Sequence, residues 1–260
     1  MKRIMILTLA LALLLTCAAT AEGYTFRMGI DAEYPPYSYM GDDGSYTGYD
    51  VEMCQKVCEI LGWNMEIVPI NWDTKLIQLD ANEIDCIWSG LTIDVLDPEA
   101  YTISMAYSDN SQMILTKKGS GIETLDDVVG KVVGVQLGTS ADILLSDGGD
   151  AADLGASFGD LIRYENYNVC FTELMGGAID AVAIDIGVAA GKIAEYGDEY
   201  YMLEEPFAAE KYGICFRKAD TEICAQVEQA FMQLVEDGTY VALAEKYGLD
   251  TSALCLTPAD

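Results

Sequence analysis

The sequence predicts an α/β protein built from two similar halves, and two stretches carry most of that prediction. Residues 85–92, Asp-Cys-Ile-Trp-Ser-Gly-Leu-Thr, run from a short apolar strand into a turn rich in hydroxyl groups and glycine. Residues 180–185, Asp-Ala-Val-Ala-Ile-Asp, repeat this plan after an amphipathic segment at 171–178. Open α/β sheets bind ligands at the carboxyl ends of their strands, so we expect both polar ends to face a ligand.

Helical and strand-like patterns alternate along the first half. The strands are expected at residues 25–30, 64–70 and 85–88, and the helices at residues 50–61 and 73–79. Asp50 is the expected N-cap of the first helix, and Pro35-Pro36 enforces an extended loop after the first strand. Such alternation predicts parallel sheets covered by helices.

A second α/β set follows a strand at 112–117 and the hinge-like composition of residues 118–121, Lys-Gly-Ser-Gly. Its elements are expected as a helix at 125–129, strands at 131–135 and 180–185, a loop-bearing element at 146–158 and a helix at 187–196. A return strand at 212–216 and helices at 222–236 and 240–247 would rejoin the first half. The predicted lobes are therefore residues 22–111 with 212–260, and residues 112–211. Two hinge crossings are expected, near 112–118 and 208–217.

The N-terminus predicts export. Met1-Lys2-Arg3, an apolar run at 4–15 and Ala19-Thr20-Ala21 have the order of a secretory signal peptide over residues 1–21. The alternative is a lipoprotein signal in which Cys17 becomes the lipid-anchored N-terminus. Both alternatives place the protein in the periplasm or outside the cell.

The charge excludes one class of partner. The chain has 43 acidic and 14 basic residues, a formal charge of −29. Such a surface repels nucleic acid and favours small cationic or zwitterionic partners. An acidic surface that serves only solubility is the alternative explanation.

Cysteine and histidine content argues against a metal, a cofactor or common hydrolase chemistry. Seven cysteines follow the leader, and an odd number at irregular spacing does not make a disulfide framework. Cys54 and Cys58 lie on the apolar face of the helix at 50–61, so we expect buried thiols rather than a metal site. The chain has no histidine, which excludes Ser-His and Cys-His catalysis and imidazole ligands. No cofactor is expected.

Four motifs in order resemble one known family. They are residues 48–53, Gly-Tyr-Asp-Val-Glu-Met; residues 84–93, Ile-Asp-Cys-Ile-Trp-Ser-Gly-Leu-Thr-Ile; residues 133–139, Val-Gly-Val-Gln-Leu-Gly-Thr; and residues 177–185, Gly-Ala-Ile-Asp-Ala-Val-Ala-Ile-Asp. Nearly all of the chain after the leader resembles the amino-acid-binding proteins of ABC transporters, the family 3 solute-binding proteins with a two-lobed type II periplasmic-binding-protein fold.

The resemblance implies a monomeric binding protein that captures a small amino-acid-like or amine solute between its lobes and delivers it to a membrane permease. It implies no catalysis. The alternative is an exported enzyme similar to cyclohexadienyl dehydratase, for which Glu173 could serve as the acid.

The resemblance also implies the ligand contacts. Asp185 would hold the ligand α-ammonium through charge-assisted hydrogen bonds, or else cap the end of its strand. Ser89, Gly90 and Thr92 would contact the amino or carboxylate end, although Thr92 could simply satisfy turn amides.

Two further groups of contacts follow from the same resemblance. Thr139 and Ser140 would receive the α-carboxylate at a helix N-terminus, where plain N-capping is the alternative. Tyr34 and Trp72 would sandwich the ligand side chain beside Asp31, and the alternative for Trp72 is a core anchor. Tyr37 is a weaker candidate for contact with the ligand side chain.

One residue departs from the family pattern. Asp97 stands where the resemblance implies an arginine that clamps the ligand carboxylate, and a carboxylate repels another carboxylate. Either another cation, Lys75 or Arg163, takes that role, or the ligand is a cationic amine bound by Asp31, Asp97 and Asp185. As a third alternative, Asp97 points to solvent beside Pro98 and caps the next turn.

Overall fold

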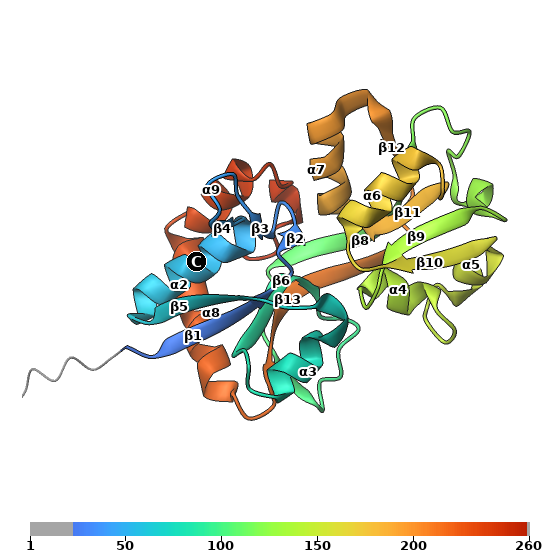
Figure 1. Ribbon diagram of the computed structural model, residues 1–260. Helices are drawn as coiled ribbons and strands as arrows, with labels where there is room; N and C mark the ends of the chain where they lie inside the picture. Colours follow the sequence, from blue (N-terminus) through green and yellow to red (C-terminus); the bar gives the residue numbers. More distant parts are fainter. Residues whose placement is uncertain (1–22, 259–260) are drawn as a thin grey trace, which may run out of the picture.

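A computed structural model describes residues 23–258, and Figure 1 shows two lobes joined by long strands. The predicted signal peptide and Cys17 lie outside the described residues. Within residues 23–258, no helix is both long and apolar enough to cross a membrane.

The first lobe is built on a parallel sheet. Strand β1 (Thr25–Ile30) lies between β5 (Asn64–Pro69) and β6 (Cys86–Thr92) and runs parallel to both. Helix α2 (Tyr49–Leu61) packs on β5, β6 and α8 (Thr221–Glu236), and α3 (Lys75–Asp80) packs on β6 and β13. Every residue of β6 is buried, so this strand has a covered sheet face on each side.

The second lobe repeats this plan. Its parallel strands are β9 (Val132–Gln136), β10 (Asp160–Tyr164) and β11 (Ala181–Asp185). They are covered by α4 (Ser140–Leu145), α6 (Tyr167–Gly176) and α7 (Ile186–Tyr196), while α5 (Ala152–Ser157) packs on α4. Each of these helices brings buried apolar residues to the sheet except α5, which has none.

Two long antiparallel strands join the lobes. Strands β8 (Ser108–Lys117) and β13 (Ala208–Arg217) pair with each other over residues 108–112 and 208–212. Beyond Gln112, β8 pairs with β11 of the second lobe, and from Tyr212 onward β13 pairs with β6 of the first. The result is one continuous sheet of order β10-β9-β11-β8-β13-β6-β1-β5, with β7 (Tyr101–Ile103) on β13 and β12 (Tyr200–Met202) on β8.

Short elements complete the chain. A small antiparallel sheet contains β2 (Glu33–Tyr34), β3 (Ser38–Met40) and β4 (Tyr46–Thr47), and α9 (Thr239–Lys246) packs on α2 and α8. Single 3-10 turns lie at Trp72–Thr74, Leu125–Val128, Gly197–Glu199 and Thr251–Ala253.

Several local predictions need correction. Asp50 is not the N-cap of α2, because Gly48 holds that position with a φ of 127°, and the Asp50 side chain is fully buried. Its Oδ2 instead accepts hydrogen bonds from Gly90 N at 2.6 Å and Tyr107 Oη at 2.9 Å, and burial raises the pKa of this carboxyl to about 7. Strand β6 also continues to Thr92, so the Ser-Gly-Leu-Thr segment is strand rather than turn.

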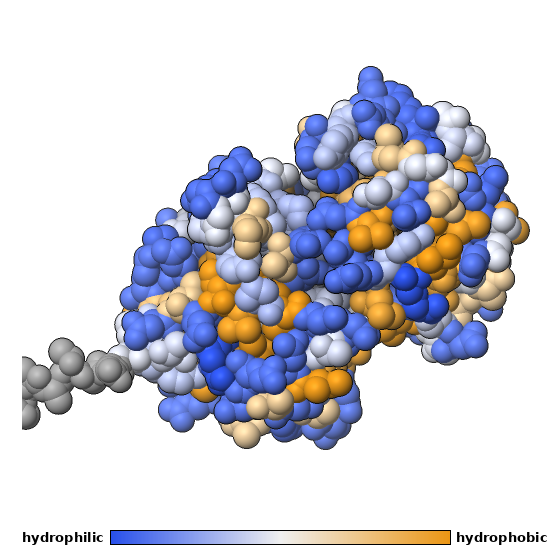
Figure 2. Space-filling model, viewed as in Figure 1, coloured by the Kyte–Doolittle hydropathy of each residue, from blue (hydrophilic) through white to orange (hydrophobic). Residues whose placement is uncertain are grey.

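The predicted burial of the helical cysteine pair is confirmed. Cys54 and Cys58 are 0% and 2% exposed, and neither forms a disulfide. On the face that Figure 2 shows, polar residues cover most of both lobes, and apolar residues lie in smaller groups between them.

Candidate functional site

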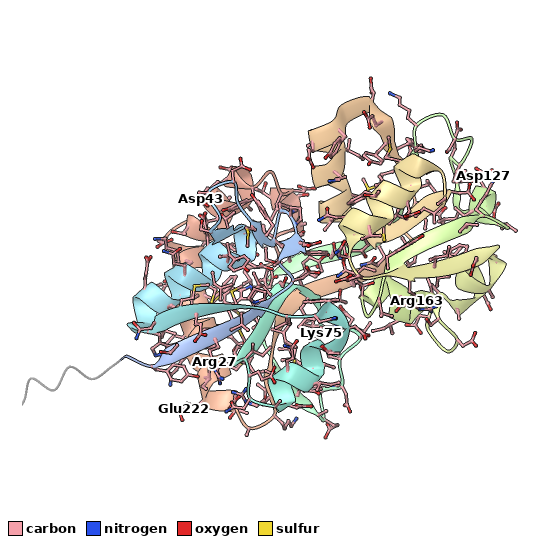
Figure 3. The ribbon with its side chains drawn as sticks, in the orientation of Figure 1. Arg27, Asp43, Lys75, Asp127, Arg163 and Glu222 are labelled. Atoms are coloured by element: carbon pink, nitrogen blue, oxygen red, sulfur yellow. The ribbon has the colours of Figure 1, made fainter. Side chains whose placement is uncertain are left out.

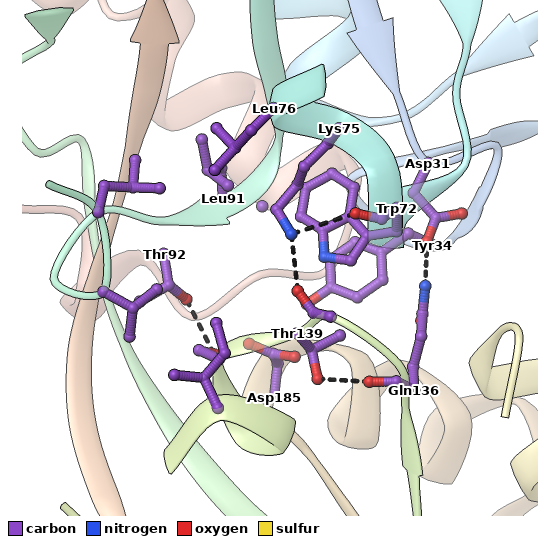
Figure 4. Close-up of a pocket in the computed structure, with 16 residues that line it drawn as sticks. Asp31, Tyr34, Trp72, Lys75, Leu76, Leu91, Thr92, Gln136, Thr139 and Asp185 are labelled. Atoms are coloured by element: carbon purple, nitrogen blue, oxygen red, sulfur yellow. Dashed lines mark hydrogen bonds between the residues drawn. The ribbon is translucent and has the colours of Figure 1, made fainter. Parts of the chain in front are cut away.

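A cavity lies between the two lobes, beside the strands that join them. Its volume is ≈ 530 Å³ when its open mouth is included. Figure 4 shows its lining. The first lobe contributes Asp31, Tyr34, Trp72, Lys75, Leu76, Gly90, Leu91, Thr92, Val95 and Leu96, and the second contributes Gln136, Gly138, Thr139, Ser140, Ile143 and Asp185.

Asp185 ends β11 and lines this cavity, as predicted from the strand pattern. It is 3% exposed. Its Oδ1 accepts hydrogen bonds from Asn110 Nδ2 at 2.7 Å, Gln112 Nε2 at 2.6 Å and Tyr212 Oη at 2.7 Å. Its Oδ2 has only a 3.5 Å contact with Tyr167 Oη, so this oxygen has room for another donor.

Thr92 and Ser140 meet across the cavity from opposite lobes. Thr92 Oγ1 lies 3.1 Å from Ser140 Oγ and donates to Glu210 Oε1 at 2.7 Å. Thr139 is the N-cap of α4, where its Oγ1 accepts from Asp142 N and donates to Gln136 O at 2.8 Å. Thr139 therefore caps α4, which is the alternative role given above, and it also lines the cavity.

Aromatic rings form one wall. Trp72 and Tyr34 both line the cavity, and Tyr37 stacks on Tyr34 with a centroid distance of 5.6 Å but is not a lining residue. Gly90 has a φ of 56°, and a Cβ at this position would lie 2.5 Å from Tyr34 Cε1. Gly90 therefore lets the tyrosine ring approach the strand.

Asp31 is buried at the base of this wall. Its Oδ2 accepts from Gln136 Nε2 at 2.6 Å, a hydrogen bond between the lobes, and its Oδ1 accepts from Glu33 N. Burial raises the pKa of this carboxyl, and the Gln136 hydrogen bond opposes that rise. Ser89, by contrast, accepts from Asp31 N and contacts Ser38 behind the cavity, so it supports Asp31 without lining the site.

Asp97 does not belong to this group of residues. It is exposed, and its Oδ1 accepts from Glu99 N at 2.8 Å, which is the solvent-facing turn cap of the third alternative. Its neighbours Val95 and Leu96 line the cavity instead. The expectation that Asp97 faces the cleft is wrong because its exposed side chain caps the turn that follows it.

The structure separates the two cations that could replace the missing arginine. Arg163 lies on β10 and binds Asp142 Oδ1 at 2.7 Å, away from the cavity lining, whereas Lys75 begins α3 and lines it (Figure 3). The Lys75 side chain donates to Trp72 O at 3.1 Å and, across the cleft, to Gly138 O at 2.6 Å. Burial lowers the pKa of Lys75 to about 8.

Sequence reasoning missed Glu210, Asn110, Gln112 and Gln136, although all four are at most 6% exposed beside the cavity. One signal was present for Glu210. It alternates with Tyr212 and Ile214, so extending the predicted strand by one pair would have placed it on the buried face. Glu173, the acid considered for an enzyme, is on α6 and is not a lining residue.

The lobes also touch closely beside α7. A Cβ on Gly187, near the start of α7, would lie 2.2 Å from Tyr37 Oη of the first lobe. With the hydrogen bonds from Gln136 to Asp31 and from Lys75 to Gly138, this contact describes a closed arrangement of the two lobes.

Comparisons with known proteins agree with this architecture. The family model of the bacterial extracellular solute-binding proteins, family 3, matches residues 26–250. The L-cystine-binding protein TcyJ of Escherichia coli (strain K12) is 32% identical over 234 residues, which cover 89% of this chain and 85% of the relative. The lysine/arginine/ornithine-binding periplasmic protein of the same strain is 29% identical over 253 residues, 92% of this chain and 95% of the relative.

A solved structure gives the same result. An ABC uptake transporter substrate binding protein from Streptococcus pneumoniae, with bound histidine, superposes with a TM-score of 0.80 at 28% identity. The match covers 89% of this chain and 95% of that one. The two-lobed fold and the solute-binding function predicted from the motifs are confirmed by these matches. The chain belongs to the bacterial extracellular solute-binding proteins, family 3.

Proposed function

We propose that this protein binds a basic α-amino acid in the cavity between its lobes. The observation that carries the proposal is the position of Lys75. Among the lining residues of the cavity, which all lie within residues 23–258, it is the one with a cationic side chain. An α-amino acid needs a cation for its carboxylate and an anion for its ammonium. Lys75 and Asp185 supply one of each.

The open hydrogen-bonding capacity fits the same ligand. An ammonium has three protons, and Lys75 uses two of them on Trp72 O and Gly138 O, which leaves one for a carboxylate. Asp185 Oδ2 has room for donors from the ligand ammonium. A ligand that lacked the carboxylate would leave the buried Lys75 charge uncompensated, so the amino acid is favoured over an amine.

Asp31 favours a second positive charge on the ligand. The lining contains two carboxyl groups, Asp31 and Asp185, against one amine, Lys75, and a basic amino acid with its two cationic groups and single carboxylate would balance this excess of one acid. Trp72 and Tyr34 lie beside Asp31, and aromatic faces attract cations. The curated relative that binds lysine, arginine and ornithine, by its name, supports this ligand class.

We further infer that residues 108–112 and 208–212 form the hinge, and that the closed protein delivers its ligand to an ABC permease from outside the cytoplasm. The change of pairing partners at Gln112 and Tyr212 supports this division. The position of Glu173 outside the cavity lining gives no support to the dehydratase-like alternative. Export through residues 1–21, or anchoring through Cys17, is part of the proposal that rests on the leader sequence alone.

A ligand panel tests the proposal. Arginine, lysine, ornithine, cystine, glutamate and the arginine-derived amine agmatine would be added to the purified protein in thermal-shift and calorimetric titrations. A ligand that binds only the folded protein raises stability by RT ln(1 + [L]/Kd), so the basic amino acids should raise the melting temperature in a concentration-dependent way. Agmatine differs from arginine only in lacking the carboxylate, and it should bind more weakly. Agmatine binding as tight as arginine, or a panel without any binder, would refute the proposal.

Small-angle scattering tests whether the lobes close about the hinge when ligand binds. A saturating ligand should reduce the radius of gyration if the lobes close around it. An unchanged radius at saturation would argue against closure between lobes that move as units.

A further inference from the structure

A buried acidic residue that does not line the cavity lies directly behind its ammonium-binding end. Glu210, on hinge strand β13, pairs in register with Asn110 on β8 and is 6% exposed. Its Oε1 accepts hydrogen bonds from Asn110 Nδ2 at 2.6 Å, Gln112 Nε2 at 2.8 Å and Thr92 Oγ1 at 2.7 Å. The proposed ligand contacts leave this residue without a role.

The same two amides hold Asp185. Asn110 and Gln112 each donate to Asp185 Oδ1 as well as to Glu210 Oε1. A side-chain amide has two N–H protons, so each can give one proton to each carboxylate. The amides are thereby held with their N–H groups toward the acids, and Asp185 is oriented with Oδ2 left for a ligand.

The two acids are close to each other and lack a cation. Within residues 23–258, neither Glu210 nor Asp185 forms an ion pair, and Glu210 Oε2 has no hydrogen-bond partner. Burial raises the pKa of Glu210 to about 7, and the Asp185 charge adds to that rise. The other titratable side chains around the pair are Tyr34, Tyr37, Tyr167 and Tyr212 near Asp185, and Asp94 and Asp150 along the surface hollow that Glu210 lines.

We propose that Glu210 is a positioning residue for the ammonium end of the ligand. It holds Asn110 and Gln112, which orient Asp185, and its negative charge strengthens the attraction for a cation bound at Asp185. The inference rests on the proposed function only in requiring an ammonium at Asp185. An amine or an amino acid would meet that requirement equally.

The pH dependence of binding distinguishes this role from a structural one. A cation at Asp185 favours ionised Glu210, so affinity should fall as pH decreases through about 7 and this carboxyl takes up a proton. Glu210→Gln keeps the volume and removes the charge. At pH 8.5 this variant should bind about tenfold more weakly than wild type, the effect of one pKa unit of coupling. Between pH 5.5 and 7.5, below the pKa of Lys75, its affinity should change little, and the wild-type affinity should approach it at the acidic end.

Two further variants complete the experiment, with affinities from calorimetry and melting temperatures measured in parallel. Glu210→Asp keeps the charge and should keep the pH dependence, even where its shorter side chain lowers affinity. Glu205→Gln removes an exposed charge from the segment just before β13 and should behave as wild type.

The outcomes separate this inference from the proposed function. The titrations use the tightest binder in the panel, whether amino acid or amine. An amine that outcompetes every amino acid would overturn recognition of a carboxylate and still leave Glu210 testable. Equal affinities of wild type and Glu210→Gln at pH 8.5, with or without a lower melting temperature, would overturn the positioning role alone. A panel in which nothing binds would overturn both.

Discussion

Replacing Lys75 by methionine tests whether this side chain has taken over the role of the missing arginine. Methionine keeps most of the side-chain volume and removes the charge. Two of the three ammonium protons are bound to Trp72 O and Gly138 O, so the ligand carboxylate can receive one charge-assisted hydrogen bond. Such a bond is worth about 1.5–3 kcal/mol, which predicts a loss of affinity of about 10- to 150-fold.

The loss should depend on the ligand carboxylate. Calorimetry would compare the best amino-acid ligand with the amine that lacks its carboxyl group, in wild type, Lys75→Met and the surface control Lys56→Met. Lys56 is exposed and its ion pair with Glu59 contributes little, so the control should bind as wild type. Lys75→Met should lose affinity for the amino acid and keep or gain affinity for the amine. Equal losses for both ligands, or no loss for either, would refute the assignment.

The pKa of Lys75 also predicts that ligand affinity falls at alkaline pH. A carboxylate favours protonated Lys75, so affinity should be complete below the pKa of about 8 and should fall as pH rises through it. Folding stability changes in the opposite direction, because burial lowers the pKa from its ordinary value and the neutral lysine is easier to bury. Wild type should therefore lose ligand above pH 8 without losing its fold, and Lys75→Met should lack this dependence.

Two other substitutions have definite expected outcomes. Asp185→Asn should weaken the best ligand by tenfold or more, since truncating one partner of a buried charge pair costs about 2–5 kcal/mol, while the melting temperature of the free protein changes little. Unchanged affinity by calorimetry would exclude Asp185 as the ammonium partner. Asp97→Ala should change affinity by less than about 0.5 kcal/mol, because Asp97 is exposed and only caps a turn. A tenfold loss in that variant would show that the side chain reaches the cleft when ligand binds.

Elements with strong local patterns were predictable from the sequence. The strand at Thr25–Ile30 lies where it was expected, and α7 begins one residue before its predicted start. The order of strands and helices repeats in both halves, so two α/β lobes could be predicted as well. The segment at 146–158 was harder, because α5 has no buried residue and therefore no apolar periodicity to mark it.

The predictable part of the site consists of strand ends. Asp185 ends an apolar strand and Thr92 follows one closely in the sequence, and these positions indicated a role at the sheet edge, although Thr92 was expected in a turn. Asp50 and Glu210 could not be assigned this way, because their roles depend on partners far along the chain. Asp50 accepts from Gly90, and Glu210 accepts from Thr92, 118 residues away. The position of Lys75 likewise became meaningful only when α3 was placed opposite Gly138.

The narrow contact at Gly187 implies that a single methyl group could hold this protein open. Alanine is favoured over glycine within a helix, so Gly187→Ala would suit α7 locally. In the closed arrangement, however, its methyl carbon would lie 2.2 Å from the Tyr37 hydroxyl oxygen, so the lobes could meet only if the Tyr37 side chain moved. Such a substitution would leave every ligand-contacting side chain unchanged and would oppose only the closure of the lobes. Uptake measured with the Gly187→Ala variant would show whether the permease responds to the bound ligand or to the closed arrangement of the lobes.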